Sequence, residues 1–414
     1  MPKSSSSSTK GSKPSLELLV TGDLFPTEKK PHRGIFMLRQ ASLLRNYGVE
    51  CSFLVTRPLL PWPLSKIGPW SSLRDTVAPP PNFDFEFRCA TYPRPPGAWF
   101  FPYEGLAKSL PVILHGHTWN KKKKFDAVLG VDMTSGAQAA VSLGKTLKIP
   151  VATLAIGSDV MIRAQTNPLV KKEISRILNH VQLPMGVSAD ICDKLSRIGP
   201  ADLMPLTVYL GKPKDYLDTN KNKAKLREHF GWKQNETVAI YAGRLSVEKG
   251  ISELASVAKK LLLRYPKLRI VCLGNGPLLK ELQKINHTIS GDNSLTTPGW
   301  IDPSEVASYM AASDFLVFPS HNEGMPQVVI EAMNMGMPVI GTRIGGIPEA
   351  VIHNETGLLI DVNAPEQLEA AMIKLIEDKA FQKTAGHAGQ ARAAGVFNPE
   401  KNAQNMAHAL YNLV

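Results

Sequence analysis

The sequence predicts an α/β protein made of two doubly wound parallel sheets. Three observations predict this fold. Short apolar runs alternate with helical segments along the chain, the alternation breaks near residue 205 and starts again, and 414 residues exceed one ordinary domain core. We expect the two domains to face each other, with the main ligand site in the cleft between them, at the carboxyl ends of strands.

The first domain is expected at residues 16–205, after a tail at 1–15. The tail is mostly Ser and Lys and lacks the apolar run of a secretory signal, so we expect it to be disordered; a short transit peptide remains the alternative. Continuous apolar runs indicate strands, and apolar residues repeated every three or four positions indicate helices. These patterns predict strands at 16–21, 51–55, 125–131, 151–154 and 183–187, and helices at 34–47, 135–148, 171–180 and 189–198.

One segment of the first domain, residues 57–104, is rich in Pro, Trp and Phe and is expected to be a long irregular insertion. Its aromatic residues could line an acceptor groove or rest on a membrane interface, or they could hold the loop onto its own domain. The run Lys121–Lys124 is either a solvated loop or a phosphate or lipid contact. These alternatives stay open.

The second domain is expected at residues 206–395, followed by a C-terminal helix at 396–414 that packs back toward the first domain. Its alternation is as regular as that of the first half, which places the domain boundary at 205. The same patterns predict strands at 238–242, 268–273, 315–319, 338–341 and 358–360, and helices at 252–265, 278–285, 303–312, 326–335, 365–378, 380–394 and 399–413.

The composition excludes several classes of protein. No run of eighteen apolar residues occurs, which excludes a membrane-spanning helix. The four cysteines have no paired spacing, so we expect reduced thiols in a cytosolic protein. Residues 1–205 hold 26 Lys and Arg against 15 Asp and Glu, whereas residues 206–414 hold 22 against 21. The first half therefore suits an anionic partner such as a phospholipid or a phosphorylated substrate, although simple solubility explains the charge equally well. Nucleic acid is not expected, because the basic residues form no recognised module.

The first motif with chemical meaning follows the strand 238–242. Gly243 is followed by two cations, Arg244 and Lys249, on either side of a turn that leads into a helix. Cations at a helix N-terminus are mildly unfavourable, so their presence needs another reason. A diphosphate would supply that reason, because Arg binds it as a fork and Lys as a point charge.

The second motif follows the strand 315–319. Glu323, Gly324 and Met325 form a loop, and Pro326 is expected at the first position of a helix that carries Glu331. Backbone N–H groups at a helix N-terminus favour an anion, and carboxylates accept hydrogen bonds from hydroxyls. The motif therefore predicts a ligand with both hydroxyls and a phosphate, that is, a nucleotide sugar. The alternative is a capping acid at Glu323 and a solvated helix face at Glu331.

Glycine-containing turns follow other strands of the second domain, at Asn275-Gly276, Gly299-Trp300 and Gly345-Gly346. Each lies where a loop faces the predicted cleft, although tight turns alone explain glycine there.

Four stretches, GRLSVEKG, GNGP, NEGMPQVVIEAMNMGMPVIGT and GGIPEAV, resemble the retaining nucleotide-sugar glycosyltransferases called family four or group 1. They occur in the family's order and spacing and cover most of residues 206–395. GDLFP, GIFMLRQASLL and IPVATLAIGSDV extend the resemblance more loosely into the first half. The resemblance implies two facing Rossmann-like domains, the GT-B architecture, with the acceptor on the first domain and the donor on the second.

The resemblance also implies roles for the motif residues. Arg244 and Lys249 would hold the donor diphosphate, Glu323 would contact the transferred sugar, and Glu331 would contact the ribose. The remaining donor contacts would come from Gly243, Gly324, Met325, Pro326, Asn275, Gly276 and Trp300, the last near the base.

Two positions in the first half depart from the family pattern. Gly34 would match a loop that approaches the diphosphate, which is commonly a glycine pair. Where the family often has His-Gly-x-Asp, this chain has Ile156, Gly157, Ser158 and Asp159, so isoleucine replaces the histidine while Gly157 and Asp159 remain. His115, His117 and His321 are the candidates to replace it.

The function implied is transfer of a hexose from a UDP- or GDP-linked donor to a hydroxyl of a glycan or lipid-linked acceptor. No Asp-x-Asp motif ends a strand, so we expect no metal and no resident cofactor. The enzyme would be cytoplasmic, with peripheral contact to the inner face of the plasma membrane. The alternatives are a sugar phosphorylase or nucleotide-sugar epimerase of the same architecture, and a two-lobed binder without catalysis.

Overall fold

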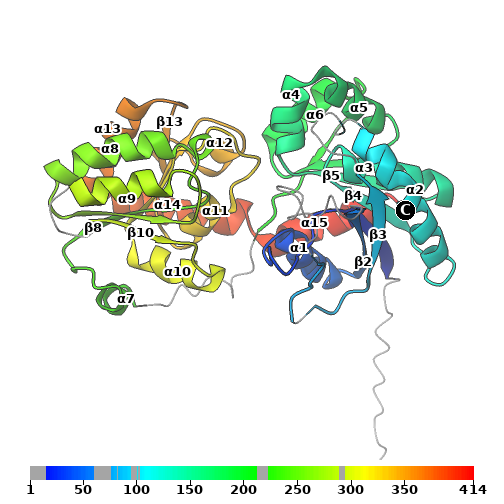
Figure 1. Cartoon of the computed structure of the whole chain (residues 1–414), viewed down its shortest axis with the longest axis horizontal. Coiled ribbons are helices and arrows are strands. Elements are labelled where there is room, and N and C mark those ends of the chain that lie inside the picture. Colours follow the sequence, from blue (N-terminus) through cyan, green and yellow to red (C-terminus); the bar gives the residue numbers. More distant parts are fainter. Residues whose placement is uncertain are drawn as a thin grey trace, which may run out of the picture. The chain divides into compact units, whose positions relative to one another are not determined.

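The computed structural model describes residues 15–59, 76–81, 83–94, 100, 103–211, 222–288 and 294–414. Contacts between residues divide the chain into two compact units. The first contains residues 1–154, 173–184 and 403–414, and the second contains residues 155–172 and 185–402. Both are built from parallel strands and helices (Figure 1). The predicted α/β class is therefore confirmed.

Seven strands of the described chain form one parallel sheet in the order β3-β2-β1-β4-β5-β6-β7. The central strands β1, β4 and β5 are buried almost throughout, as expected for strands covered by helices on both faces. The elements associated with this sheet are β1 (Leu16–Gly22), α1 (Ile35–Arg45), β2 (Val49–Leu59), β3 (Phe87–Pro93), α2 (Glu104–Asn120), β4 (Ala127–Val131), α3 (Ser135–Leu147), β5 (Val151–Ala155), a π-helix (Asp159–Arg163), α4 (Ala164–Thr166), α5 (Pro168–Leu178), β6 (Leu183–Gly186), α6 (Ala189–Ile198) and β7 (Leu206–Thr207).

Gly34 sets the start of α1. It has φ +69°, and a Cβ on this residue would lie 2.1 Å from the carbonyl oxygen of Leu24. Glycine is therefore required for the turn itself, whatever else this loop contacts.

The segment 57–104 is more regular than its composition predicts. The strand β2 continues to Leu59, and β3 pairs with it in parallel at the edge of the sheet. The expectation of an irregular insertion is thus wrong for these residues. The sequence pattern missed β3 because its burial alternates between exposed and buried positions, as edge strands permit. Residues 60–75, 82, 95–99 and 101–102 of this segment, and residues 1–14 of the predicted tail, lie outside the described residues.

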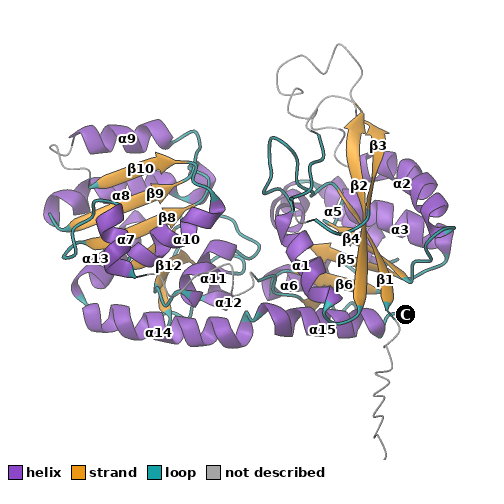
Figure 2. Ribbon diagram, turned by 90° about the horizontal axis from the view of Figure 1, so that it is seen from below, coloured by secondary structure: helices purple, strands orange, loops and turns teal. Residues whose placement is uncertain are grey.

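A second parallel sheet contains six strands of the described chain in the order β10-β9-β8-β11-β12-β13 (Figure 2). The strand order reverses between β8 and β11, and such a reversal is where doubly wound folds bind their ligands. The elements are α7 (Lys223–His229), β8 (Thr237–Ala242), a 3₁₀ turn (Val247–Lys249), α8 (Ile251–Arg264), β9 (Leu268–Leu273), α9 (Leu279–Thr288), β10 (Leu295–Gly299), α10 (Pro303–Ala312), β11 (Phe315–Phe318), α11 (Gln327–Asn334), β12 (Val339–Thr342), α12 (Ile347–Ala350), β13 (Gly357–Ile360), α13 (Pro365–Glu377) and α14 (Lys379–Val396).

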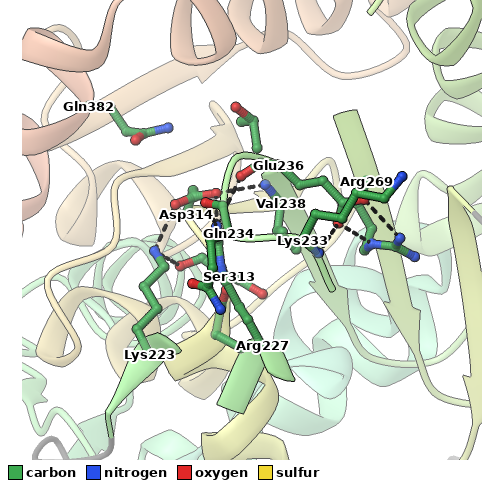
Figure 3. Close-up of polar contacts among 12 residues, drawn as sticks. Lys223, Arg227, Lys233, Gln234, Glu236, Val238, Arg269, Ser313, Asp314 and Gln382 are labelled. Carbon is green, nitrogen blue, oxygen red and sulfur yellow. Dashed lines mark hydrogen bonds and ion pairs between the residues drawn. The ribbon is translucent and has the colours of Figure 1, made fainter. Parts of the chain in front are cut away.

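A charged network ties α7 to the amino ends of this sheet (Figure 3). Asp314, just before β11, accepts hydrogen bonds from Lys223 Nζ at 2.6 Å, Arg227 Nη2 at 2.8 Å and the N–H of Val238 at 2.6 Å. The Arg227 side chain is buried and also donates to the carbonyl of Ala312. The network therefore lies at the end of the strands opposite to their carboxyl ends.

The last helix, α15 (Pro399–Tyr411), runs into the first unit, which includes residues 403–414. The hydroxyl of Tyr411 donates to the carbonyl of Gly48 at 2.8 Å, and Gln40 Nε2 lies 3.5 Å from Met406 Sδ. The proposed boundary at 205/206 remains a prediction. Among the helices described, none is both long and apolar enough to cross a membrane.

Candidate functional site

The predicted donor residues gather at the carboxyl edge of the six-stranded sheet. The loop after β8 carries Gly243, Arg244 and Lys249, and the loop after β11 carries Glu323. Because β8 and β11 are neighbours at the reversal of strand order, their loops emerge side by side. The sheet topology therefore brings together two motifs that are far apart in the sequence.

Lys249 and Glu323 join these two loops directly. Lys249 Nζ lies 2.6 Å from Glu323 Oε1 and 3.4 Å from the carbonyl oxygen of Asn322. The two side chains are 26% and 13% exposed, so the pair is largely but not completely shielded from solvent. A cation and a carboxylate held in this way can receive a phosphate and a hydroxyl at adjacent positions.

The loop after β11 is fixed by contacts that the sequence did not reveal. The N–H of His321 donates to the carbonyl of Glu248 at 3.0 Å, and its Nε2 lies 2.9 Å from Glu253 Oε1. Ser320 Oγ donates to the same carbonyl of Glu248 at 3.4 Å. His321 is thus oriented by an acid in the first turn of α8, and Glu253 is a positioning residue that sequence reasoning missed.

Gly345 supports Glu323 from the other side. It has φ +56°, and a Cβ on it would lie 1.8 Å from the carbonyl oxygen of Glu323. The next amide, of Gly346, donates to the carbonyl of Gly324 at 2.9 Å. The glycine pair therefore has a specific task beyond a tight turn, because only glycine allows this approach.

The amides of Gly324 and Met325 lie just before α11. Within the described part of the chain, neither N–H has a hydrogen-bond acceptor. Pro326 is the N-cap of α11 and not its first helical residue, which corrects the predicted position by one residue. Free amides next to a helix N-terminus are suited to an anion.

Glu331 lies inside α11 and is only 7% exposed. Its burial excludes the solvated helix face that was the alternative interpretation. A buried carboxylate is costly unless polar groups contact it, and Glu331 does interact with other groups of the chain. Its contact with a ligand stays a prediction.

A cavity of about 330 Å³ lies at the ends of β8, β9 and β10. Trp300 forms one wall and is 55% exposed. The Arg244 side chain is 67% exposed and reaches within 3.8 Å of Glu248, while the Tyr241 hydroxyl donates to the Arg244 carbonyl at 2.8 Å. The residues that line the cavity are Ala242, Gly243, Arg244, Leu273, Gly274, Asn275, Trp300, Ile301 and Val306.

Three further predicted site residues are Gly276, Asp159 and Gly34. Gly276 packs against the Leu245 carbonyl and does not line the cavity. Asp159 is 3% exposed and begins the π-helix after β5. Gly34 lies in the first unit. The roles of these three residues toward a ligand stay predictions.

Comparison with known proteins adds independent information. Residues 222–392 match the family model "Glycosyl transferases group 1". The putative teichuronic acid biosynthesis glycosyltransferase TuaC of Bacillus subtilis is 24% identical over 412 residues, covering 95% of this chain and 97% of that protein. A GDP-mannose-dependent phosphatidylinositol monomannoside mannosyltransferase of Mycobacterium tuberculosis is 29% identical over 175 residues, which are 41% of this chain and 45% of that protein.

Among solved structures, Anabaena HepE in complex with UDP has a TM-score of 0.72 and 18% identity, with 96% of this chain and 100% of that chain covered. At this identity the likeness concerns the fold. It agrees with two Rossmann-like parallel sheets in one chain.

Proposed function

We propose that the chain is a retaining hexosyltransferase of the group 1 glycosyltransferases, which would transfer a sugar from a nucleotide sugar. The match of residues 222–392 to that family's model and the likeness to TuaC over nearly the whole chain support this. Its acceptor would be a hydroxyl of a growing polysaccharide, a glycolipid or a lipid-linked glycan. The observation that carries the proposal is the Lys249–Glu323 pair, 2.6 Å apart, beside the free amides of Gly324 and Met325. This arrangement supplies positive charge, an acceptor for a hydroxyl and backbone donors at one point.

In the proposed reaction, the bond between the anomeric carbon and the β-phosphate oxygen breaks while a bond to the acceptor oxygen forms. Negative charge develops on the departing oxygen, and Lys249, Arg244 and the amides before α11 would stabilise it there. The acceptor's proton would pass to the departing phosphate, on the same face of the sugar, which retains the configuration. Glu323 would contact the transferred sugar, and Glu331 the ribose hydroxyls.

The cavity beside Trp300 would receive the base. Its volume of about 330 Å³ and its aromatic wall suit stacking of a flat ring. HepE was crystallised with UDP, and the mycobacterial relative is named for GDP-mannose. These names support a UDP- or GDP-linked donor without deciding between uracil and guanine.

We further propose that the transfer needs no metal ion or resident cofactor, since two cations and several amides can neutralise the leaving diphosphate. The enzyme would work in the cytoplasm, at the inner face of the plasma membrane. Two observations support this. Residues 1–205 contain an excess of Lys and Arg over Asp and Glu, and the name of the relative TuaC assigns it to teichuronic acid biosynthesis.

The direct test is incubation of the protein with a panel of UDP- and GDP-sugars, with and without candidate acceptors and chelator. We expect one donor to stabilise the protein against heat and to release nucleoside diphosphate slowly by hydrolysis, with or without chelator. Stabilisation without release indicates a binder. Sugar isomerisation without release indicates an epimerase, and phosphate-dependent formation of sugar 1-phosphate indicates a phosphorylase. Each of these outcomes would contradict the proposed function.

A further inference from the structure

The helix α2 presents three leucines to solvent, whereas its Val112 and Trp119 are buried. All three of its leucines are exposed, Leu106 by 52%, Leu110 by 63% and Leu114 by 59%. They recur every four residues, so they lie on one face of the helix. A helix of a globular domain normally turns such a stripe toward the core.

The buried face of α2 is already occupied by its own contacts. The helix packs against α3, and its buried residues include the apolar Val112 and Trp119 beside the small or polar Gly105, Lys108, Ser109 and Gly116. A Cβ on Gly116 would lie 2.6 Å from Leu143 Cδ2, so α2 comes close to Leu143 of α3 at a glycine. The buried side of α2 is already closely packed, so the leucines are not needed to fill the core of this unit.

A run of cations continues from the C-terminal end of this helix. Lys121, Lys122 and Lys124 are exposed, while Lys123 pairs with Glu17 at 2.9 Å. From Gly105 to Phe125 the sequence has no Asp or Glu. Figures 1 and 2 show α2 at the margin of its unit, beside α3. We call the three leucines and the exposed lysines that follow the same helix the leucine–lysine surface.

We propose that the leucine–lysine surface docks the enzyme onto an anionic lipid bilayer, with the leucines in the interface and the lysines on the headgroups. Helices that lie in a membrane interface typically combine an apolar face with nearby lysines. An anionic leaflet attracts each nearby lysine, which contributes about a fivefold factor in affinity. A second copy of the chain is a poorer occupant, because it would bring the same positive charge to the contact.

This inference extends the membrane part of the proposed function and names the residues that make the contact. It predicts that the leucines and the lysines contribute separately. The lysine part is screened by salt, whereas the leucine part is not.

The test is flotation of the full-length protein with vesicles of phosphatidylcholine, with or without phosphatidylglycerol. We expect binding to the anionic vesicles at low salt. The triple change Leu106→Ser, Leu110→Ser and Leu114→Ser should abolish it. The triple change Lys121→Gln, Lys122→Gln and Lys124→Gln should weaken it by about a hundredfold.

Matched controls come from α8 and the loop after it. Leu263 is 66% exposed, and Lys259 and Lys267 are exposed as well. Leu263→Ser alone, and Lys259→Gln with Lys267→Gln, should leave flotation unchanged. A fluorescent label at Leu110→Cys, in a Cys89→Ser background because Cys89 is the exposed thiol among the four cysteines, should brighten with anionic vesicles.

Absence of wild-type binding to anionic vesicles, or binding that survives both triple changes, would overturn the proposal. So would a wild-type dimer that the leucine changes convert to a monomer, since the surface would then serve self-association. Donor hydrolysis measured without vesicles should be equal in all variants. Flotation without any diphosphate release would instead overturn the catalytic function and leave the docking surface intact.

Discussion

Lys249 Nζ and Glu323 Oε1 lie 2.6 Å apart, although 74 residues separate them in the sequence. The pair joins the loops that follow β8 and β11, the two strands at the reversal of strand order. It fixes the position of each charged group before a ligand arrives. Such preorganisation lets charged groups stabilise developing charge without rearranging during the reaction.

We predict that Lys249→Met lowers the rate of diphosphate release by roughly 10²- to 10³-fold, the range found when one charge-stabilising donor is lost. Glu323→Gln should lower it as well, because the carboxylate orients Lys249 and would contact the sugar. The measurement is release of nucleoside diphosphate at saturating donor. Lys260→Met is the control. Lys260 lies on α8, away from the site, and its Nζ forms a surface ion pair with Glu369 at 3.0 Å. Equal rates for wild type and Lys249→Met would contradict the assigned role.

Trp300→Ala should weaken nucleotide binding by roughly tenfold to a hundredfold, because stacking of a base on an aromatic ring contributes about 1–3 kcal/mol. Titration calorimetry with UDP and GDP measures this change. Tyr103→Ala removes an aromatic residue that is 51% exposed in the first unit, and it should leave the affinity unchanged. Identical affinities for wild type and Trp300→Ala would place the base elsewhere.

Gly345→Ala should lower turnover sharply, because the added methyl group would collide with the Glu323 carbonyl and displace this loop. The matched control is Gly231→Ala. Gly231 has φ +69°, so an alanine there would be strained in the same way as at Gly345. A Cβ at Gly231, however, would meet nothing within 4 Å. Both variants should lose stability by about 1–2 kcal/mol from the left-handed backbone alone. Only Gly345→Ala should also reduce turnover at a temperature where both variants are folded. Equal turnover in the two variants would show that the close approach of Gly345 to the Glu323 carbonyl is not needed.

Asp314→Asn should destabilise the fold by about 3–5 kcal/mol, because it leaves the buried Arg227 guanidinium without its carboxylate. Urea unfolding followed by circular dichroism measures the loss. Glu369→Gln breaks an exposed pair and should cost less than about 1 kcal/mol. Similar losses for the two variants would show that the network in Figure 3 is not a strong stabilising element.

The same aspartate predicts a pH dependence. Burial alone would raise the pKa of Asp314, but Lys223, the Val238 N–H and Arg227 outweigh it and hold the pKa below its ordinary value of 3.8. Its stabilising contribution is therefore complete above about pH 4 and is lost as the pH falls through the lower folded value. The stability difference between wild type and Asp314→Asn should shrink over this range. A difference that stays constant from neutral to acid pH would contradict this explanation.

Much of the second domain could be predicted from sequence, because its strands are continuous apolar runs and its motifs follow them directly. Gly243, Arg244, Lys249, Glu323 and Gly324 were placed at strand ends, where the structure has them. The direct Lys249–Glu323 contact could not be predicted, since it depends on which strands are neighbours. The contact of His321 with Glu253 depends on the same adjacency of loops.

The clearest failure of sequence reasoning is α2. Its three leucines face solvent, its buried face mixes Gly105 and Lys108 with Val112 and Trp119, and Pro111 lies within it, so the helix lacks the usual apolar pattern. Lys108 is fully buried because Ser135 Oγ lies 2.7 Å and Glu104 Oε1 3.4 Å from its Nζ. Folding brings Ser135 to Lys108 from 27 positions away in the sequence, whereas Glu104 is its i,i+4 neighbour on the same helix. The element that was missed is the one that carries the proposed membrane surface.

The most direct test of the donor site is a crystal structure of the protein soaked with UDP or GDP. We predict the diphosphate against Lys249 and the amides of Gly324 and Met325, with the base beside Trp300. A nucleotide bound at any other position would contradict the donor site, even if the protein proves to be a glycosyltransferase.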